Sequence, residues 1–499
     1  MMVHLMLAPV VLPFLTGSLL LLPFARSNTR RRNLVLVSSV LLLAVSLVLL
    51  VTTHQQGASY YALGGWAPPY GILFYLDRLA SLMLVLTSLL TLAVLLYACA
   101  GEDKTGSYFY PLVMFQVAGI QGAFLTADIF NLFVFFEILL MASYALLMHG
   151  GGRERARVGV HYVILNLVGS SLFLLALGLL YATLGSLSLP DLAVRVQQVS
   201  EDQQPLVKAA GLLLLAVFAL KAALLPLHFW LAATYSAASA PVAALFAIMT
   251  KVGLYSIYRV HTQLFGPAAG DLAGLVQPWL WPLAGLTLVA AIVGLLASQQ
   301  LRRLVAYSIL LSVGTLVFAA ALQTPEALGA ALYYLVHSTL ISAALFLLAD
   351  VILQQRGQDA LQAGPAVRQP VWLGGLFFVA ALVAIGLPPF SGFMGKLLLL
   401  QASVSHGLWI WPWILLGSLA LIITFSRAGS SLFWRAEASL QSASETQAPR
   451  MHWTQLAAIL LLLACSPLMV IFAEPLYEFT FLAAEALFVA PQPLIWSET

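Results

Sequence analysis

The sequence predicts an all-α, polytopic membrane protein of about fourteen transmembrane helices. Of its 499 residues, 62% are hydrophobic and only 8% are charged, whereas soluble domains carry about 25% charged residues. Apolar stretches of roughly 20 residues, the length that crosses a bilayer core, recur from one end of the chain to the other. Transmembrane β-strands are shorter and alternate apolar with polar residues, so a β-barrel is not expected.

The first apolar stretch, residues 5–24, comes before its basic residues: Arg26, Arg30, Arg31 and Arg32 all follow it. A cleaved signal peptide has its positive charge ahead of the apolar region. We therefore expect a retained first helix whose N-terminus lies outside the cytoplasm.

Fourteen apolar stretches are predicted to span the membrane. The twelfth is too long for one straight helix and contains Pro388-Pro389. Because proline removes a backbone donor and clashes with the preceding turn, we predict a broken helix there. The segment after Glu474 is amphipathic, includes Trp496 and is expected to lie at the membrane interface. The predicted spans are residues 5–24, 34–52, 71–98, 108–126, 129–149, 159–183, 207–230, 240–262, 275–297, 304–323, 327–348, 371–404, 408–426 and 453–473.

The charges of the loops agree with this count. Cytoplasmic loops of membrane proteins are enriched in lysine and arginine. With the N-terminus outside, the loops expected in the cytoplasm hold Arg26, Arg30, Arg31, Arg32, Lys104, Arg153, Arg155, Arg157, Arg302, Arg303, Arg356, Arg368, Arg427, Arg435 and Arg450. The outer side holds only Arg78, Arg195, Lys208 and Arg259. One missed helix would invert every later loop, so the bias supports fourteen spans.

A short internal repeat indicates how the spans are organised. Residues 219–226 and 381–388 are identical at five of eight positions, and they lie in the seventh and twelfth spans. A five-helix unit repeated in tandem must be inverted in the membrane, because five is odd. Inverted repeats with broken helices are typical of transporters. We therefore predict a three-helix region (1–107), two inverted five-helix repeats (108–262 and 275–426) with broken helices 7 and 12, and a region with the last helix and an amphipathic tail (427–499).

Four charged residues lie deep inside predicted spans, away from the span ends: Glu137, Lys221, Lys251 and Lys396. A charge at the bilayer centre costs about 2.5–3.5 kcal/mol on insertion scales, so each residue needs a reason. Glu137 lies roughly 12 Å deep at 1.5 Å per residue. Its alternative role is a protonated, hydrogen-bonded packing residue, a task that glutamine could perform without an ionisable proton.

The three lysines suit proton exchange, because burial disfavours the charged form of lysine. Lys221 precedes Pro226, which is expected to open its helix and free backbone carbonyls. Lys396 follows the break at Pro388-Pro389. Snorkelling to the interface is the alternative for each lysine, and it is strongest for Lys396, which could lie nearer a surface.

His337, central in the eleventh span, is as well suited to a proton relay as to neutral packing. Asp77 and Arg78 are expected to form a local ion pair. No phosphate loop, haem-ligand pair, Ser/His/Asp arrangement or Cys/His cluster is found, so neither a cofactor nor a metal is expected. A nucleic-acid partner is not expected either, because the sequence has no basic patch interleaved with aromatic residues. The pattern indicates ion or proton translocation.

Several segments make the chain resemble a known family. They are Phe130-Asn131-Leu132-Phe133-Val134-Phe135-Phe136-Glu137, Leu220-Lys221 with Leu225-Pro226-Leu227-His228-Phe229-Trp230, Ala240-Pro241-Val242 with Lys251-Val252-Gly253-Leu254-Tyr255, Arg302-Arg303-Leu304-Val305-Ala306-Tyr307-Ser308, and residues 386–393 with Lys396. The chain resembles the antiporter-like subunits shared by respiratory complex I and the multisubunit Mrp (also Pha or Mnh) cation/proton antiporters. The resemblance covers nearly the whole chain and is closest to the D-type subunits.

The resemblance implies roles for the buried residues. Glu137 would pair with Lys221 across the fifth and seventh helices, Lys251 would be the connecting lysine and Lys396 the terminal one. Some relatives carry a further lysine four or five residues after the eleventh-helix histidine. This chain has Ile341 and Ser342 at those two positions instead of a lysine. The groups that remain to carry a proton between Lys251 and Lys396 are His337, Ser338, Thr339 and water.

The resemblance also implies a function and a location. The chain would be a proton-translocating subunit of a Na⁺(or K⁺)/H⁺ antiporter in the bacterial inner (plasma) membrane, driving cation efflux by proton uptake. Its partners would be the other Mrp/Pha subunits, of A, B, C, E, F and G type, with membrane lipid, protons and Na⁺ or K⁺. The alternative is a proton-pumping membrane subunit of complex I or of a membrane-bound hydrogenase. No redox site is expected in this chain in either case.

Overall fold

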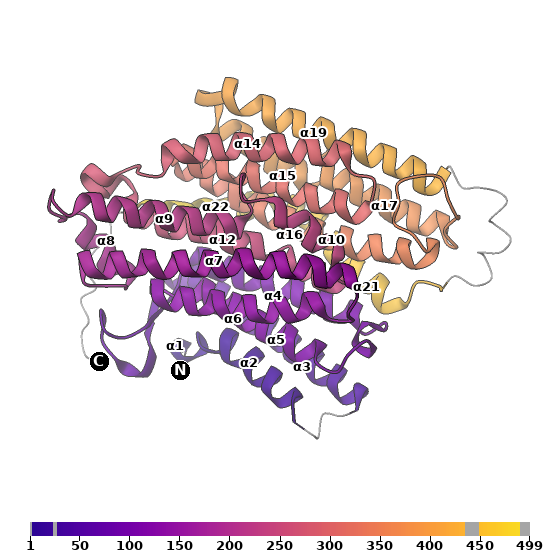
Figure 1. The fold of residues 1–499 in the computed structure, drawn as a ribbon, viewed down its shortest axis with the longest axis horizontal. Coiled ribbons are helices and arrows are strands. Elements are labelled where there is room, and N and C mark those ends of the chain that lie inside the picture. The colour runs from indigo at the N-terminus through magenta and orange to yellow at the C-terminus, as the bar shows by residue number, and fades with distance from the viewer. Residues whose placement is uncertain (1, 23–26, 435–448, 490–499) are drawn as a thin grey trace.

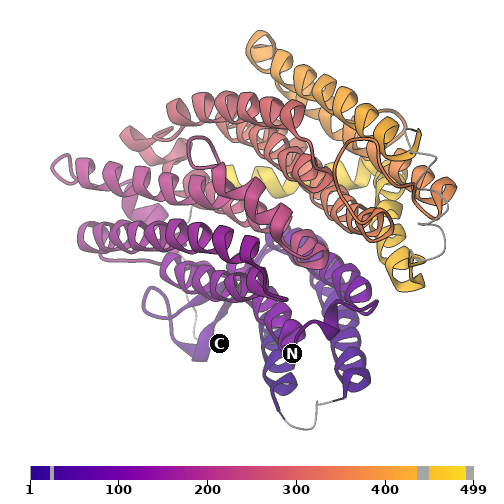
Figure 2. The same cartoon turned by 45° about the vertical axis from the view of Figure 1, so that its right-hand side comes forward.

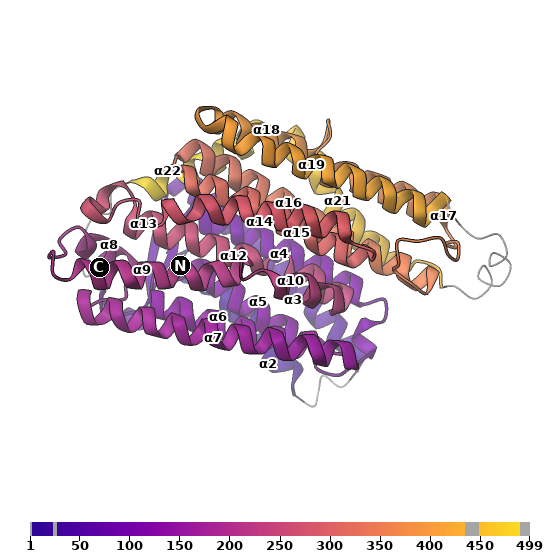
Figure 3. The same ribbon diagram turned by 45° about the horizontal axis from the view of Figure 1, so that its top comes forward.

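The fold is a bundle of long helices that run side by side along the longest axis of the molecule (Figure 1). The structure is a computed structural model, and it describes residues 2–22, 27–434 and 449–489. The N-terminal helices lie on one flank of the bundle and α19 (Gly407–Gly429) on the opposite flank (Figures 2 and 3). Within the described residues, eleven helices are long and apolar enough to cross a membrane, and three shorter apolar helices accompany them. The all-α membrane fold is confirmed, and the count of fourteen spans stays a prediction.

The apolar stretches of the sequence form the helices of the bundle. In the first half they are α1 (Met2–Leu5), α2 (Ala8–Leu20), α3 (Asn28–Gln56), α4 (Arg78–Ala98), α5 (Phe109–Leu125), α6 (Ile129–Met148), α7 (Arg153–Leu184), α8 (Leu189–Val196), α9 (Gln204–Ala222) and α10 (Phe229–Ala237). In the second half they are α11 (Ala240–Phe246), α12 (Met249–Ser256), α13 (Thr262–Phe265), α14 (Gln277–Ala297), α15 (Leu301–Leu322), α16 (Pro325–Arg356), α17 (Pro370–Ile385), α18 (Ser391–Ala402), α21 (Trp453–Ile471) and α22 (Ala473–Phe488). A π-helical turn, Ile257–His261, joins α12 to α13. Between α3 and α4, strands β1 (Ser59–Ala62) and β2 (Leu73–Leu76) form an antiparallel hairpin with Tyr60 opposite Tyr75.

One end of the bundle, called here the arginine-rich end, gathers loops that were expected in the cytoplasm. Arg155 donates to the carbonyl of Ala237 at 3.0 Å, and Arg302 donates to that of Ala238 at 2.9 Å. These bonds satisfy carbonyls that the end of α10 leaves free. The hairpin and α8 lie at the opposite end (Figure 1). Two arginines of the predicted set lie outside the described residues: Arg26 and Arg435.

Helices 7 and 12 are broken, as predicted. Residues 223–228 separate α9 from α10, and residues 386–390 separate α17 from α18. The first residue after each helix adopts a left-handed conformation, with φ of 60° at Ala223 and 81° at Gly386. A left-handed residue at this position ends a helix and turns the chain away from its axis.

When the two breaks are compared by their hydrogen bonds, the correspondence is shifted by one residue from the one that the sequence match implies. In each, an N–H beyond the helix bonds the carbonyl five residues earlier, from Leu224 at 2.8 Å and from Leu387 at 3.2 Å. These two residues are therefore structurally equivalent. The match between residues 219–226 and 381–388 instead places Gly386 opposite Leu224. Helix termination, rather than residue identity, sets the true correspondence.

The centre of the molecule is formed by α16 and by the span from Ala240 to Phe265. Every residue from 327 to 349 in α16 is buried, as is the apolar window of the other span. Around α16 lie α4, α11, α15, α17, α18, α21 and α22. The segment after Glu474, which was expected at the membrane interface, forms α22 and packs along α16, with Phe479, Thr480, Ala483, Ala484 and Leu487 buried. Trp496 lies outside the described residues.

Asp77 pairs with Arg259, so the expected local pair with Arg78 is wrong. The Arg259 guanidinium donates to both Asp77 oxygens, at 2.6 and 2.7 Å, and lies 5.3 Å from the ring centres of Tyr75 and Tyr255. Asp77 is the N-cap of α4 and also accepts a backbone N–H of that helix. The Asp77 carboxylate therefore stays at the N-terminus of α4, next to Arg259 of the π-helical turn.

Candidate functional site

Glu137 and Lys221 each contact α7 rather than each other. Ser170 Oγ donates to Glu137 Oε1, and Lys221 Nζ donates to Asn166 Oδ1 at 3.1 Å. Asn166 and Ser170 are four residues apart, so they lie one turn apart on the same face of α7. Among the described residues, no ion pair joins Glu137 to Lys221. The direct contact expected from the sequence is absent in this conformation, because the two side chains reach successive turns of α7.

Lys221 lies at the end of α9, immediately before its break. The side chain is buried, with 5% of the residue exposed, and its ammonium is 5.9 Å from the centre of the Phe136 ring. The C-terminus of a helix carries partial negative charge, which favours a cation there. Gly253 of α12 lies against the same break: a Cβ on Gly253 would be 2.6 Å from the backbone nitrogen of Ala222. Only glycine therefore lets α12 approach Lys221 this closely.

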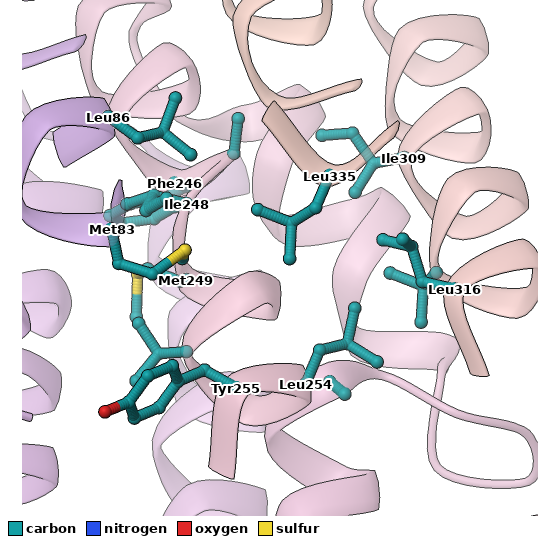
Figure 4. Packing of buried hydrophobic residues seen from close by; sticks show 14 of the residues in the cluster. Met83, Leu86, Phe246, Ile248, Met249, Leu254, Tyr255, Ile309, Leu316 and Leu335 are labelled. Atoms are coloured by element: carbon teal, nitrogen blue, oxygen red, sulfur yellow. The ribbon is translucent and has the colours of Figure 1, made fainter. Parts of the chain in front are cut away.

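Lys251 is fully buried in α12. Its Nζ donates to Ser312 Oγ of α15 at 3.0 Å, and Ser312 donates to the carbonyl of Ile309 at 2.7 Å. No carboxylate pairs with Lys251 within the described part of the chain. An ammonium has three donors, so this contact satisfies only one of them. Apolar side chains of the neighbouring helices pack around α12 (Figure 4): Met83, Leu86, Phe246, Ile309, Leu316 and Leu335.

His337 lies in the middle of α16 and contacts the beginning of α18. Its Nδ1 is 2.8 Å from Ser391 Oγ, which is 2.9 Å from Ser466 Oγ of α21. The backbone N–H of Ser391 also donates to Ser466 Oγ at 3.2 Å. The three side chains are buried, and they line a cavity of about 10 Å³ together with Ile341.

Lys396 lies in α18 and is held by the broken span itself. Its Nζ donates to the carbonyl of Ile385, the last residue of α17, at 2.7 Å, and to Ser418 Oγ of α19 at 2.8 Å. Only 7% of the residue is exposed, so its side chain is enclosed by the protein. The break frees the Ile385 carbonyl, because no following turn of helix is there to bond it.

Polar partners of these residues were not identified from the sequence. All are neutral residues within apolar helices: Asn166, Ser170, Ser312, Ser391, Ser418 and Ser466. Serine in a membrane helix commonly bonds its own backbone, so its presence is a weak signal. Of these partners, Asn166 is the one that the sequence could have revealed, because a side-chain amide inside an apolar span needs a hydrogen-bond partner.

Protonatable groups thus lie in five helices, each with a hydroxyl, amide or carbonyl at hydrogen-bonding distance. Two of them, Lys221 and Lys396, lie beside the two helix breaks. His337 contacts the second break through Ser391, five residues before Lys396. The arrangement can hold and pass protons inside a membrane.

Comparisons with known proteins give a consistent result. A family model described as NADH:quinone oxidoreductase/Mrp antiporter, TM, matches residues 126–424. The chain is 36% identical over 534 aligned residues to the D-type subunit of a probable K(+)/H(+) antiporter of Rhizobium meliloti, covering 99% of this chain and 97% of that one. It is 37% identical over 462 residues to the D-type subunit of the Na(+)/H(+) antiporter of Bacillus subtilis, covering 91% and 92%. It superposes on a chain of the Mrp complex from Dietzia sp. DQ12-45-1b with a TM-score of 0.85, 27% identity and 98% of both chains covered.

Proposed function

The chain belongs to the transmembrane family shared by NADH:quinone oxidoreductase and Mrp antiporters, and from this premise we propose that it is the proton-translocating D-type subunit of a multisubunit monovalent cation/proton antiporter. It is a multi-pass protein of the bacterial plasma membrane. Relatives that match nearly end to end are named as D-type antiporter subunits, which favours this function over that of a redox-driven pump. Cation efflux would be driven by proton uptake, with no redox chemistry in this chain.

The observation that carries the proposal is the burial of three lysines, two of them beside the helix breaks, together with a half-buried glutamate, Glu137. A charge at membrane depth is costly and marks an ion or proton path. A packed protein interior could do without these residues, since burying a charged group costs free energy unless it is fully paired and hydrogen-bonded. Their retention supports a transport role.

The proposed route runs from Glu137 and Lys221 through Lys251 and His337 to Lys396. In the described conformation Glu137 and Lys221 are apart. Closing this pair would hold Lys221 protonated, and opening it would let Lys221 pass a proton towards Lys251. The break between α9 and α10 supplies a place where Lys221 can move.

The remaining features of the proposal concern assembly. The partners would be subunits of A, B, C, E, F and G type, with lipid, protons and Na⁺ or K⁺. Within this chain, residues 108–262 and 275–426 would act as inverted halves, flanked by residues 1–107 and 427–499. Each half then contains one broken span and one lysine beside the break.

The test is expression of the complete gene cluster in everted vesicles, where dequenching of a pH-sensitive dye on addition of Na⁺ or K⁺ reports exchange. Lys251→Ala and Lys396→Ala should each abolish most exchange, because each removes a proton-carrying group from the route. The matched control is Lys104→Ala, since Lys104 is exposed at the arginine-rich end. Full exchange in the Lys396 variant at equal protein level would contradict the route.

Reconstituting the chain alone tests the assembly. We expect no cation-dependent proton flux from the purified chain in vesicles, and recovery of flux with the whole complex. Robust exchange by the chain alone would refute the multisubunit proposal. A complex whose proton movement requires an electron donor, and not Na⁺ or K⁺, would favour the redox-pump alternative.

A further inference from the structure

The hydrogen bonds around His337 determine which of its ring nitrogens carries the proton. A neutral imidazole has one donor and one acceptor nitrogen, and a neighbouring group sets which is which. Here the neighbour is a pair of serines from two other helices, Ser391 at the start of α18 and Ser466 in α21. All three residues are at most 5% exposed, so the two hydroxyls and Nδ1 depend on one another for hydrogen bonds.

The direction of the bonds follows from accounting for each hydroxyl hydrogen. Ser466 Oγ accepts the backbone N–H of Ser391 at 3.2 Å, and its only other contact among the described residues is Ser391 Oγ at 2.9 Å. The Ser466 hydroxyl therefore donates to Ser391 Oγ. The Ser391 hydroxyl then has one acceptor left, His337 Nδ1 at 2.8 Å. The reverse direction would leave the Ser466 hydrogen without an acceptor, which costs about 1–3 kcal/mol when the donor is buried. The favoured direction puts the remaining hydrogen on Nε2, which is not among the fully buried side-chain atoms that lack a partner.

The adjoining cavity does not change this result. Its volume, about 10 Å³, is at the lower limit for one water molecule, and a buried water needs two to four polar partners. Apart from the imidazole and the two serines, its walls are apolar: Leu340, Ile341, Val383, Leu462, Leu463 and Met469.

The other ring nitrogen faces the break that holds Lys396. A Cβ on Gly392 would lie 2.8 Å from His337 Nε2, so this edge of the ring lies against the backbone of α18. On the same break, a Cβ on Gly386 would lie 3.1 Å from the carbonyl of Gly392 and 3.2 Å from Cδ of Lys396. The Nε2 edge and the Lys396 stem therefore adjoin the same short segment of backbone.

We propose that Ser391, oriented by Ser466, is a positioning residue that holds neutral His337 with its proton on Nε2, the edge that faces the Lys396 break. His337 then exchanges its proton through Nε2, while Nδ1 stays engaged by the serine. The consequence for transport rests on the proposed function. The protonation pattern of the ring does not, and it can be measured without any flux.

The test uses the full chain in lipid vesicles with ¹⁵N-labelled histidine rings and solid-state NMR, with the His337 signals assigned by their loss in His337→Gln. The unmodified chain should show a bare Nδ1 and a protonated Nε2. Ser391→Ala should give a mixture of both tautomers, and Ser391→Thr should restore the single form because it keeps the hydroxyl. The control is Ser403→Ala: Ser403, which directly follows the same helix, is buried and bonds only that helix's carbonyls.

In the intact complex, Ser391→Ala should lower exchange about fivefold to tenfold, the loss expected for one hydrogen bond, with recovery in Ser391→Thr. A proton on Nδ1 in the unmodified chain, or a spectrum that Ser391→Ala leaves unchanged, would overturn the proposal. Full exchange in His337→Gln would instead remove His337 from the route and so overturn the transport consequence, whatever the spectrum shows.

Discussion

At position 137, replacing glutamate with glutamine separates the effect of the charge from the effect of the side chain's size. Glutamine matches glutamate in size and keeps a hydrogen-bond acceptor for Ser170, yet it carries no charge to attract Lys221. In the described conformation Glu137 and Lys221 bond to successive turns of α7 and not to each other. We therefore expect them to influence each other through their charges, and to form a direct pair only if the side chains move. This makes substitutions that preserve size the most informative ones.

We predict that Glu137→Gln and Lys221→Ala each remove exchange, and that the double variant is no worse than either, because both act on one step. Glu137→Asp should keep part of the activity, since the charge survives but its reach shortens by one methylene. The measurement is a double-mutant cycle on exchange rates in everted vesicles with matched protein levels. Glu201→Gln, at an exposed loop position, is the control. Near-normal exchange in Glu137→Gln would end the switching hypothesis.

The neighbouring serines Ser170 and Ser171 offer a matched pair on α7. Ser170 is buried and donates to Glu137, whereas Ser171 is exposed and bonds only the carbonyl of Leu167 at 3.1 Å. A hydrogen bond to a charged group contributes about 1.5–3 kcal/mol. We therefore expect Ser170→Ala to slow exchange by about tenfold or more and Ser171→Ala to leave it unchanged. Equal rates in the two variants would show that Ser170 does not act on Glu137.

At the scale of elements, the approach of α12 to the α9 break depends on one missing side chain. A Cβ on Gly253 would collide with backbone atoms of Lys221 and Ala222, at 2.9 and 2.6 Å. Backbone cannot rotate away as a side chain can, so the helices themselves must shift. The position of Lys221 is thus set by helix packing as well as by the break.

Gly253→Ala should destabilise the chain by about 1–3 kcal/mol through overpacking and should impair exchange as well. Gly178→Ala is the control, since Gly178 lies in α7 with open space around it and alanine favours a helix there by up to about 1 kcal/mol. Thermal unfolding in detergent, followed by tryptophan fluorescence, measures both. If the Gly253 variant unfolded at the same temperature as the Gly178 variant, the close packing at the break would be refuted.

At the scale of the whole molecule, the distribution of arginines predicts orientation. Labelling positions should be chosen with their contacts in view: Arg302 donates to Ser236 and Ala238 carbonyls and is unsuitable, whereas Arg153 and Arg303 are exposed. Both lie in loops expected in the cytoplasm, because positive charge is retained on that side. Glu201 is exposed in a loop predicted on the outer side.

Single cysteines at Arg153 and Arg303 should react with a membrane-impermeant maleimide only from the cytoplasmic side, and a cysteine at Glu201 only from outside. The background replaces Cys99 and Cys465, both free thiols, with alanine. Intact cells and everted vesicles give the two sides. Labelling of Arg153→Cys from outside would invert the topology, and opposite sides for positions 153 and 303 would break the fourteen-span count.

The sequence by itself determined the all-helical membrane fold, the two broken spans and the burial of Lys221, Lys251, His337 and Lys396, whereas Glu137 is half-buried. Apolar length, proline and intramembrane charge are local properties, each with a large free-energy consequence in lipid. Only the tertiary structure decided the partners. Asp77 bonds Arg259 rather than Arg78, Lys221 bonds Asn166, and the breaks align one residue away from the sequence match. A partner depends on how each helix is rotated and how closely its neighbour approaches, and a difference of one residue turns a side chain by about 100° around a helix of 3.6 residues per turn.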